Sequence, residues 1–135
     1  IYCIPFKITN GVITNTEGKL NSDTNEIILS MSGHDVKSVI FDIPRYVLDS
    51  QSSTNTDSVF TVMSNDKMTE YQEVESDSDS RQIKLDYPNT TKTTFAIIGT
   101  HAIPEFGSIS ILILVVTIMS ILLIGKSFSN RFVKF

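Results

Sequence analysis

The chain has 135 residues, with 11 Lys or Arg against 15 Asp or Glu and a formal net charge of −4. This acidic balance excludes the basic stripe that neutralises phosphates, so no nucleic acid is expected as a partner. A single cysteine excludes an internal disulfide. Residues 1–102 are long enough for one domain and too short for two.

Alternating apolar and polar residues predict short strands throughout residues 1–102. In the first of them Ile4, Phe6 and Ile8 alternate with polar residues, and Asn10-Gly11 then signals a turn. The other strands are expected at 12–15, 26–32, 36–43, 59–64, 69–75, 81–87 and 93–100. Short strands separated by polar turns predict an all-β fold, a small antiparallel β-sandwich of the immunoglobulin-like (Ig-like) type.

Two segments depart from this pattern. Pro44–Asp49 begins with a proline that suits a first helical position or an edge, so a short helical turn or crossover is expected. Gln51–Ser58 is rich in Ser, Thr and Asn and has no hydrophobic residue, which predicts a solvated loop. The strands at 59–64 and 93–99 carry adjacent bulky apolar residues, which is typical of a central strand and leaves lateral assembly open.

The reactive side chains do not form a recognisable catalytic set. Cys3 stands at the predicted start of a strand, where a lone cysteine is most often a small buried hydrophobic residue. The alternatives are pairing with another chain and a reactive thiol. His34 and His101 have no recognisable partner, although a nucleophile would need a base within reach. A blue-copper site needs two His and one Cys with an axial Met, usually close together late in the chain, and Cys3 comes too early. We therefore expect no enzyme activity.

The densest acidic run is Glu73–Ser80. Oxygen ligands at alternate positions suit a hard cation such as Ca²⁺, but the glycine of a calcium-binding loop is missing. The favoured interpretation is a solvated hairpin loop that keeps an edge charged and resistant to aggregation. No metal and no cofactor are therefore expected.

Asn89-Thr90-Thr91 is an Asn-x-Thr sequon, which makes Asn89 a candidate for glycosylation on an exported protein. The sequon follows Pro88 between two predicted strands, where an exposed turn is expected. The alternative interpretation is an ordinary polar turn.

The last quarter of the chain differs sharply in composition. Twelve of the sixteen residues 109–124 are Ile, Leu or Val, interrupted by Ser110, Thr117 and Ser120. On the insertion scale they favour membrane entry by about 5 kcal/mol. Sixteen helical residues rise about 24 Å, short of the ~30 Å hydrocarbon core, and neighbouring residues extend the span. We predict a single transmembrane helix over 108–125.

Basic residues predict how this helix is oriented. The tail 126–135 carries Lys126, Arg131 and Lys134, whereas residues 1–107 hold eight Lys or Arg against fifteen Asp or Glu, a charge of −7. The positive-inside rule therefore places the tail in the cytoplasm and the acidic domain outside. Because the chain begins with Ile1, the export signal is expected upstream of it.

Pro104, Glu105, Phe106 and Gly107 stand directly before the predicted helix and the basic tail. This layout resembles the PEFG-CTERM sorting signal of archaeal surface proteins. The resemblance implies that residues 103–135 are the substrate of an archaeosortase, a membrane-embedded cysteine transpeptidase that processes the chain near the motif and discards the helix and tail. The mature protein would then keep no transmembrane helix.

Upstream segments are similar to the small β domain that precedes this signal. They are Ile4-Pro5-Phe6-Lys7-Ile8-Thr9-Asn10-Gly11, Ile43-Pro44-Arg45, Phe60-Thr61-Val62, Tyr71-Gln72-Glu73 and Ile98-Gly99-Thr100. One departure is visible, because Ser64-Asn65-Asp66-Lys67 replaces the expected Asp-Gly hairpin and leaves its turn type open. The family implies no known chemistry for this domain.

Two functional interpretations follow. The first is a non-enzymatic cell-surface protein whose domain, residues 1–102, is structural, adhesive or ligand-binding, with the membrane, an archaeosortase and cell-envelope proteins as partners. The second is a permanent single-pass accessory subunit that keeps its helix. Ser110, Thr117 and Ser120 are small enough to lie at a helix–helix contact in that case.

Overall fold

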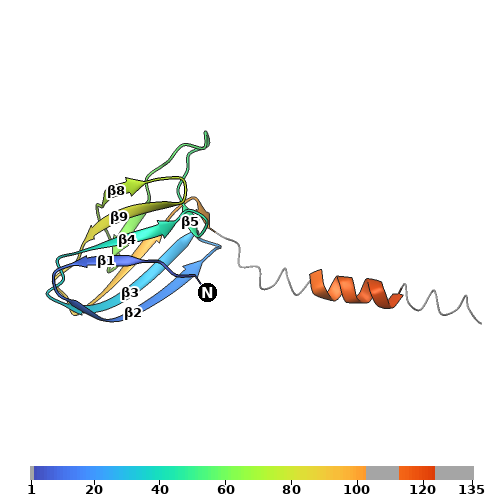
Figure 1. The fold of residues 1–135 in the computed structure, drawn as a ribbon, viewed down its shortest axis with the longest axis horizontal. Coiled ribbons are helices and arrows are strands. Elements are labelled where there is room, and N and C mark those ends of the chain that lie inside the picture. Colours follow the sequence, from blue (N-terminus) through green and yellow to red (C-terminus); the bar gives the residue numbers. More distant parts are fainter. Residues whose placement is uncertain (1, 103–112, 124–135) are drawn as a thin grey trace, which may run out of the picture. The chain divides into compact units, whose positions relative to one another are not determined.

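The computed structural model describes residues 2–102 and 113–123, and the chain divides into two units, Ile1–Pro104 and Glu105–Phe135. The first unit, the N-terminal domain, is built of strands (Figure 1). They are β1 (Phe6–Thr9), β2 (Val12–Asn21), β3 (Glu26–His34), β4 (Ser38–Pro44), β5 (Leu48–Asp49), β6 (Thr61–Ser64), β7 (Lys67–Met68), β8 (Gln72–Ser76), β9 (Ser80–Asp86), β10 (Lys92–Ile98) and β11 (His101–Ala102).

The strands form two main antiparallel sheets. A four-stranded sheet has the order β1-β4-β9-β8, and a five-stranded sheet has the order β2-β3-β10-β6-β7. A short third sheet pairs β5 with β11. The prediction of an all-β antiparallel domain is confirmed. β10 lies between β3 and β6, which confirms the central position expected for the strand at 93–99.

The core lies between the two main sheets. It is formed by the inward-facing residues, which alternate with outward-facing ones along each strand. Phe41 of β4 and Phe95 of β10 meet edge to face across it, with ring centroids 5.7 Å apart. Tyr87 also packs against Phe95, and its hydroxyl donates a hydrogen bond to the Met31 carbonyl at 3.1 Å. The fully buried apolar residues are Val39, Ile43, Leu48, Ile83 and Ile97, among others. Their alternation is the period of two that a strand with one buried face requires.

The turn at Asn10-Gly11 is confirmed, but it does not close a hairpin. Both residues have left-handed backbone, with φ of 60° and 70°. β1 pairs with β4 and β2 pairs with β3, so this turn carries the chain from one sheet to the other. A Cβ atom at Gly11 would lie 2.2 Å from the His34 carbonyl oxygen, so only glycine fits there.

This connection also changes the strand order expected from the immunoglobulin-like prediction. In immunoglobulin constant domains the first two strands pair in one sheet. Here the first strand pairs with the fourth, and the second and third strands pair in the opposite sheet. The order differs because the Asn10-Gly11 turn crosses between the layers.

The hairpin turn that the sequence left open is a two-residue turn. Asn65 and Asp66 both have left-handed backbone, with φ of 48° and 63°, and they join β6 to β7. Asn and Asp tolerate this conformation better than other non-glycine residues, so they replace an Asp-Gly pair. The single strand predicted at 69–75 is wrong in part, because β7 ends at Met68 and β8 begins at Gln72 in the other sheet.

The two segments expected to be irregular are so only in part, because Leu48–Asp49 at the end of the first one form the strand β5. After β4 the Val47 N–H donates to the Pro44 carbonyl at 2.9 Å, which closes the expected turn before β5. Residues 53–57 are exposed, as expected of a solvated loop. β2 continues to Asn21, beyond the predicted range 12–15, because pairing with β3 holds residues that have weak strand propensity.

In the second unit the described residues, 113–123, are helical and their side chains are exposed. Among the residues that the structure describes, no helix is both long and apolar enough to cross a membrane. The predicted span 108–125 extends beyond the described residues at both ends. The motif 104–107 and the tail 126–135 lie outside them as well.

Candidate functional site

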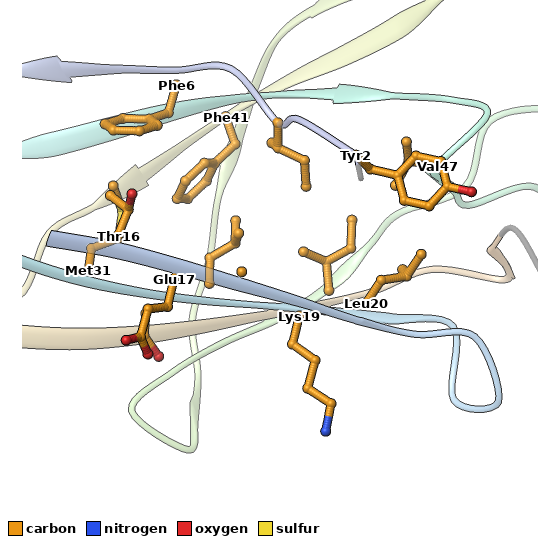
Figure 2. A pocket seen from close by; sticks show the side chains of 14 residues that line it. Tyr2, Phe6, Thr16, Glu17, Lys19, Leu20, Met31, Phe41 and Val47 are labelled. Atoms are coloured by element: carbon orange, nitrogen blue, oxygen red, sulfur yellow. The ribbon is translucent and has the colours of Figure 1, made fainter. Parts of the chain in front are cut away.

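A cleft of about 370 Å³ opens between the edges of the two main sheets, on the side where β1 and β2 lie (Figure 2). One wall is the segment 2–6 that leads into β1, and the other wall is β2 from Thr16 to Leu20. Its floor is apolar and consists of Ile27, Leu29, Met31, Phe41 and Val47. A volume above 300 Å³ with an apolar lining is typical of small-molecule sites.

The cleft exists because the two sheets diverge at this edge. β1 contributes only four paired residues, Phe6–Thr9, and the chain before Pro5 leaves the sheet. Gly18 faces the cleft and has no side chain to fill it. The space beside it is open, because an added Cβ would meet only Leu29, at 3.4 Å. Tyr2 and Phe6 therefore stay 52% and 39% exposed at the rim.

The charged residues of β2 do not point into the cleft. Glu17 and Lys19 are directed away from it, toward the outer face of the five-stranded sheet (Figure 2). Their neighbours Thr16, Gly18 and Leu20 lie opposite inward residues of β3 and face the cleft instead. The cleft thus offers an apolar surface with few polar groups and suits an apolar occupant.

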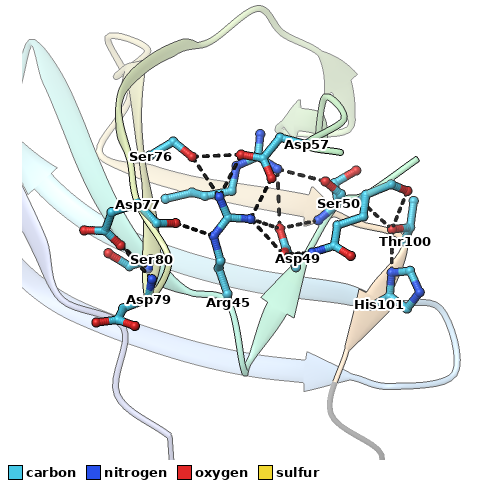
Figure 3. Close-up of polar contacts among 12 residues, drawn as sticks. Arg45, Asp49, Ser50, Asp57, Ser76, Asp77, Asp79, Ser80, Thr100 and His101 are labelled. Atoms are coloured by element: carbon cyan, nitrogen blue, oxygen red, sulfur yellow. Dashed lines mark hydrogen bonds and ion pairs between the residues drawn. The ribbon is translucent and has the colours of Figure 1, made fainter. Parts of the chain in front are cut away.

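The opposite side of the domain holds a network of ion pairs around two arginines (Figure 3). Arg45 donates to both carboxylate oxygens of Asp57, at 2.8 and 2.7 Å, and to Asp49 at 2.9 Å. It also donates to the Ser76 hydroxyl at 2.8 Å and to the Asp77 carbonyl at 2.6 Å. One side chain thereby ties the turn after β4, the loop 51–58 and the β8–β9 hairpin together.

Arg81 is the second centre of this network and is 1% exposed. Its guanidinium forms a bidentate pair with Glu73, at 2.7 and 3.0 Å, and donates to the Ser50 carbonyl at 3.0 Å. The guanidinium carbon lies 4.3 Å from the centroid of the Phe60 ring, a cation–π geometry. Bidentate bonding and ring stacking together satisfy a charge that would otherwise be costly to bury.

The network shifts the ionisation of its members. Hydrogen bonds from Arg45, and then from Ser76, lower the pKa of Asp57 from 3.8 to about 2. The same Arg45–Asp57 bond raises the pKa of Arg45. Burial lowers the pKa of Arg81, but hydrogen bonding to Glu73 and the charge of Glu73 outweigh it and leave that pKa raised. Each of these pKa shifts means that the interactions of the network favour the charged form of the side chain, as expected for structural ion pairs.

This arginine network, the clamp (Arg45, Arg81, Asp49, Asp57 and Glu73), was missed by sequence reasoning. The sequence does contain one indication of it. Arg81 alternates along the strand with Ile83 and Leu85, so it is predicted to face the core as they do. An arginine at an inward position predicts buried acidic partners, but the sequence does not say which. Because all three guanidinium nitrogens of both arginines bond protein acceptors, the clamp is built to hold loops together.

The acidic run Glu73–Ser80 forms the predicted hairpin, with β8 and β9 on either side of its turn. Asp77 caps this turn, because its Oδ1 accepts from the Asp79 and Ser80 N–H groups at 2.7 and 2.8 Å. These bonds lower the pKa of Asp77, that from Ser80 most. Within residues 2–102 and 113–123, no group of three or more His, Cys, Asp or Glu is placed to hold a metal ion.

The prediction that Cys3 is buried is wrong. Its side chain is exposed, because the chain enters β1 only at Phe6 and Cys3 lies in the irregular segment before it. His34 ends β3, whereas His101 lies in β11 and bonds Thr100 at 2.8 Å. Asn25, which lies just before β3, also bonds Thr100, so His101 lies near the opposite end of β3 from His34. A nine-residue strand is about 25 Å long.

Asn89 lies in an exposed bend between β9 and β10, as predicted. Thr90 is tied down there by bonds to the Lys92 carbonyl at 3.1 Å and to the Thr93 hydroxyl at 2.9 Å. The Thr91 carbonyl accepts from the Gly33 N–H at 3.0 Å. The sequon thus sits on a fixed and accessible turn, which leaves glycosylation a prediction.

Comparisons with protein-family models, with curated proteins and with solved structures found no match to this chain.

Proposed function

We propose that this chain is a non-enzymatic cell-surface protein, a β-sandwich displayed outside a membrane and attached through its C-terminal segment. In this proposal residues 108–125 span the membrane before processing. Residues 104–107 act as a PEFG sorting signal that an archaeosortase recognises. The domain's role is structural, adhesive or ligand-binding, and its cleft is the surface available for an apolar partner.

The observation that carries this proposal is the chemistry of the helix 113–123. Its apolar side chains are exposed, from Ile118 at 47% to Leu123 at 66%. Its two hydroxyls bond the helix's own backbone, Thr117 to the Ile113 carbonyl and Ser120 to the Val116 carbonyl, both at 2.8 Å. A helix that satisfies its polar groups internally and leaves its apolar faces uncovered suits a hydrocarbon environment.

The placement of reactive residues supports a non-catalytic role. His34 and His101 stand far apart, and Cys3 lies in the segment before β1. The buried charges of the N-terminal domain are engaged in the clamp, whose pKa shifts favour fixed ion pairs. A general base near pH 7 would need the opposite kind of shift.

Cysteine labelling in intact cells of the source organism tests the orientation. Cys3 is exposed, so a membrane-impermeant maleimide should label it from outside. In the matched control, Cys3→Ser removes that thiol and Ser129→Cys places one in the basic tail. The tail thiol should not react in intact cells. It should react after lysis only in chains that have not yet been processed.

Labelling of the tail thiol but not of Cys3 in intact cells would overturn the proposed orientation. Labelling of Cys3 outside, together with a tail thiol that stays on the mature protein after lysis, would keep the orientation. That result would favour the permanent single-pass subunit over a sorted surface protein.

A further inference from the structure

We propose that two copies of this chain pair antiparallel through their β2 edges, centred on Gly18, and that this pairing covers the cleft of each copy. The paired strands join the two five-stranded sheets into one continuous sheet. β2 forms the outer edge of its sheet along all ten of its residues, Val12–Asn21. A long free edge is a template for a further strand.

The backbone of β2 presents the right groups at its centre. The backbone N–H and C=O of Thr94 in β10 both bond Asn65, on the β6 side. The backbone groups of the next residue, Phe95, therefore point the other way and bond its partner Leu29 in β3. Alternate residues of a strand bond to opposite sides, and Gly18 lies opposite Leu29 across the other edge of β3. Gly18 is therefore a non-hydrogen-bonded residue toward β3, and its N–H and C=O face outward, available to a second copy.

The charges of β2 are complementary to themselves. A two-fold axis at Gly18 places Glu17 of one copy directly opposite Lys19 of its partner, and the reverse pair forms on the other side of the axis. These are non-hydrogen-bonded pairs of the new ladder, in which side chains approach most closely. Opposite charges at directly opposed positions stabilise strand pairing, and like charges oppose it.

The other free edges lack this property. β8 has the same spacing of charges, but a two-fold axis at Val74 would place Glu73 opposite Glu75 of the partner. β1 and β7 are only four and two residues long. The bulge at Ile13–Asn15 interrupts β2 but leaves Thr16–Leu20 regular for pairing. Among these edges, self-pairing is thus favoured at β2.

Pairing would also cover the exposed apolar surface of the cleft. Thr16, Gly18 and Leu20 form its wall and lie on the strand that would pair. A second copy brings its own β2, with the cleft beside it, to that wall. The rim residues Tyr2 and Phe6, 52% and 39% exposed, would become less accessible to water. Burial of apolar surface stabilises such an association.

Disulfide trapping in the full chain, in detergent and in native membranes, tests this pairing. Gly18→Cys is made with Cys3→Ser, so that the only thiol lies on the proposed axis. Directly opposed residues of a hydrogen-bonded pair have Cα atoms about 5.5 Å apart, which suits a disulfide. The added Cβ meets only Leu29 at 3.4 Å, so the domain should fold. A disulfide-linked dimer is expected on a non-reducing gel.

Asn21→Cys in the same background is the matched control. Residue 21 would lie opposite Asn15 of the partner, so the two new thiols would be about 20 Å apart and should not cross-link. If two copies were held together by their C-terminal helices alone, cross-linking at residue 18 would not be favoured over cross-linking at residue 21. Equal cross-linking of the two variants, or none at position 18, would overturn the proposal.

Charge exchange provides an independent test in the Gly18→Cys background. Glu17→Lys alone, or Lys19→Glu alone, should slow cross-linking on the order of tenfold, because two attractive pairs become repulsive. The double variant Glu17→Lys/Lys19→Glu restores both pairs and should cross-link like the parent. Mixing the two single variants should restore it as well. Slow cross-linking of the double variant would contradict pairing about Gly18.

Discussion

The two lateral sides of the N-terminal domain close the space between its sheets in different ways. At the β8 and β6 side, Arg81 extends from β9 into the interior and is held by Glu73, Ser50 and the Phe60 ring. At the β1 and β2 side the sheets diverge around an apolar cleft, with Gly18 in its wall. A side sealed by charged hydrogen bonds is rigid and complete, whereas a side left open and apolar is available to a partner.

The largest effect is expected from breaking the sealed side. Arg81→Met should lower the free energy of unfolding by about 3–5 kcal/mol, because it leaves the Glu73 carboxylate and the Ser50 carbonyl without the buried guanidinium. Urea unfolding of the full chain in detergent, followed by circular dichroism, measures this loss. Lys84→Met on the same strand is the control and should change stability by less than about 0.5 kcal/mol. Equal losses in the two variants would show that the clamp does not stabilise the domain.

Two glycines near the open side should respond oppositely. Gly11→Ala should destabilise by about 2 kcal/mol or more, since its φ of 70° and the His34 carbonyl at 2.2 Å leave no room for a side chain. Gly18→Val should stabilise by up to about 1 kcal/mol, because it buries methyl groups in the cleft and removes a flexible residue. Melting temperatures of both variants test this contrast. A stability loss at Gly18 as large as that at Gly11 would mean that the cleft is already full.

A smaller effect is expected where the sealed side depends on a single neutral hydrogen bond. The Tyr71 hydroxyl accepts from the Phe60 N–H at 2.8 Å and so positions the ring that stacks on Arg81. Tyr71→Phe should cost about 1 kcal/mol, because it leaves a partly buried N–H without its acceptor. Tyr46→Phe is a matched control, since Tyr46 is 67% exposed and should tolerate the change. Similar unfolding midpoints for the two variants would argue against this role of Tyr71.

The smallest expected effect is the loss of the stabilisation by Asp57 at low pH. The pKa of Asp57 is about 2 in the folded protein against an ordinary 3.8, so its stabilisation is present above about pH 5 and is lost as the pH falls through 2. Asp57→Asn should be less stable than wild type at pH 7, and the difference should shrink toward pH 2. Melting temperatures between pH 2 and 7 give this comparison. A difference that stays constant with pH would show that Asp57 does not act through its charge.

Much of the sealed side's fold, but not its chemistry, could be predicted from the sequence. Alternation at Arg81, Ile83 and Leu85 predicts β9, and the acidic run predicts the hairpin before it. The partners of Arg81 come from segments far apart in the chain, and strand periodicity carries no information on which loops meet. Cys3 was misplaced for a related reason, since the point at which a terminal segment joins a sheet depends on the strand it pairs with.

The Asn10-Gly11 turn shows which features the local sequence determines and which depend on distant parts of the chain. Asn10-Gly11 predicts a left-handed turn from local chemistry alone, and the turn is there. Whether such a turn closes a hairpin or crosses between sheets depends on where β4 and β3 offer free edges, which no local pattern contains. The cleft depends on where the two sheets diverge beside β1 and β2, which the sequence pattern does not contain either.

In the proposed function, the C-terminal segment sorts this protein to the cell surface and is then removed. The most direct measurement is the mass of the C-terminal peptide of the protein isolated from native membranes. A terminus near Gly107 that carries added mass is expected, because in this proposal a transpeptidase exchanges the helix and tail for an anchor. An intact terminus at Phe135 would contradict it and would show that the helix itself remains as the anchor.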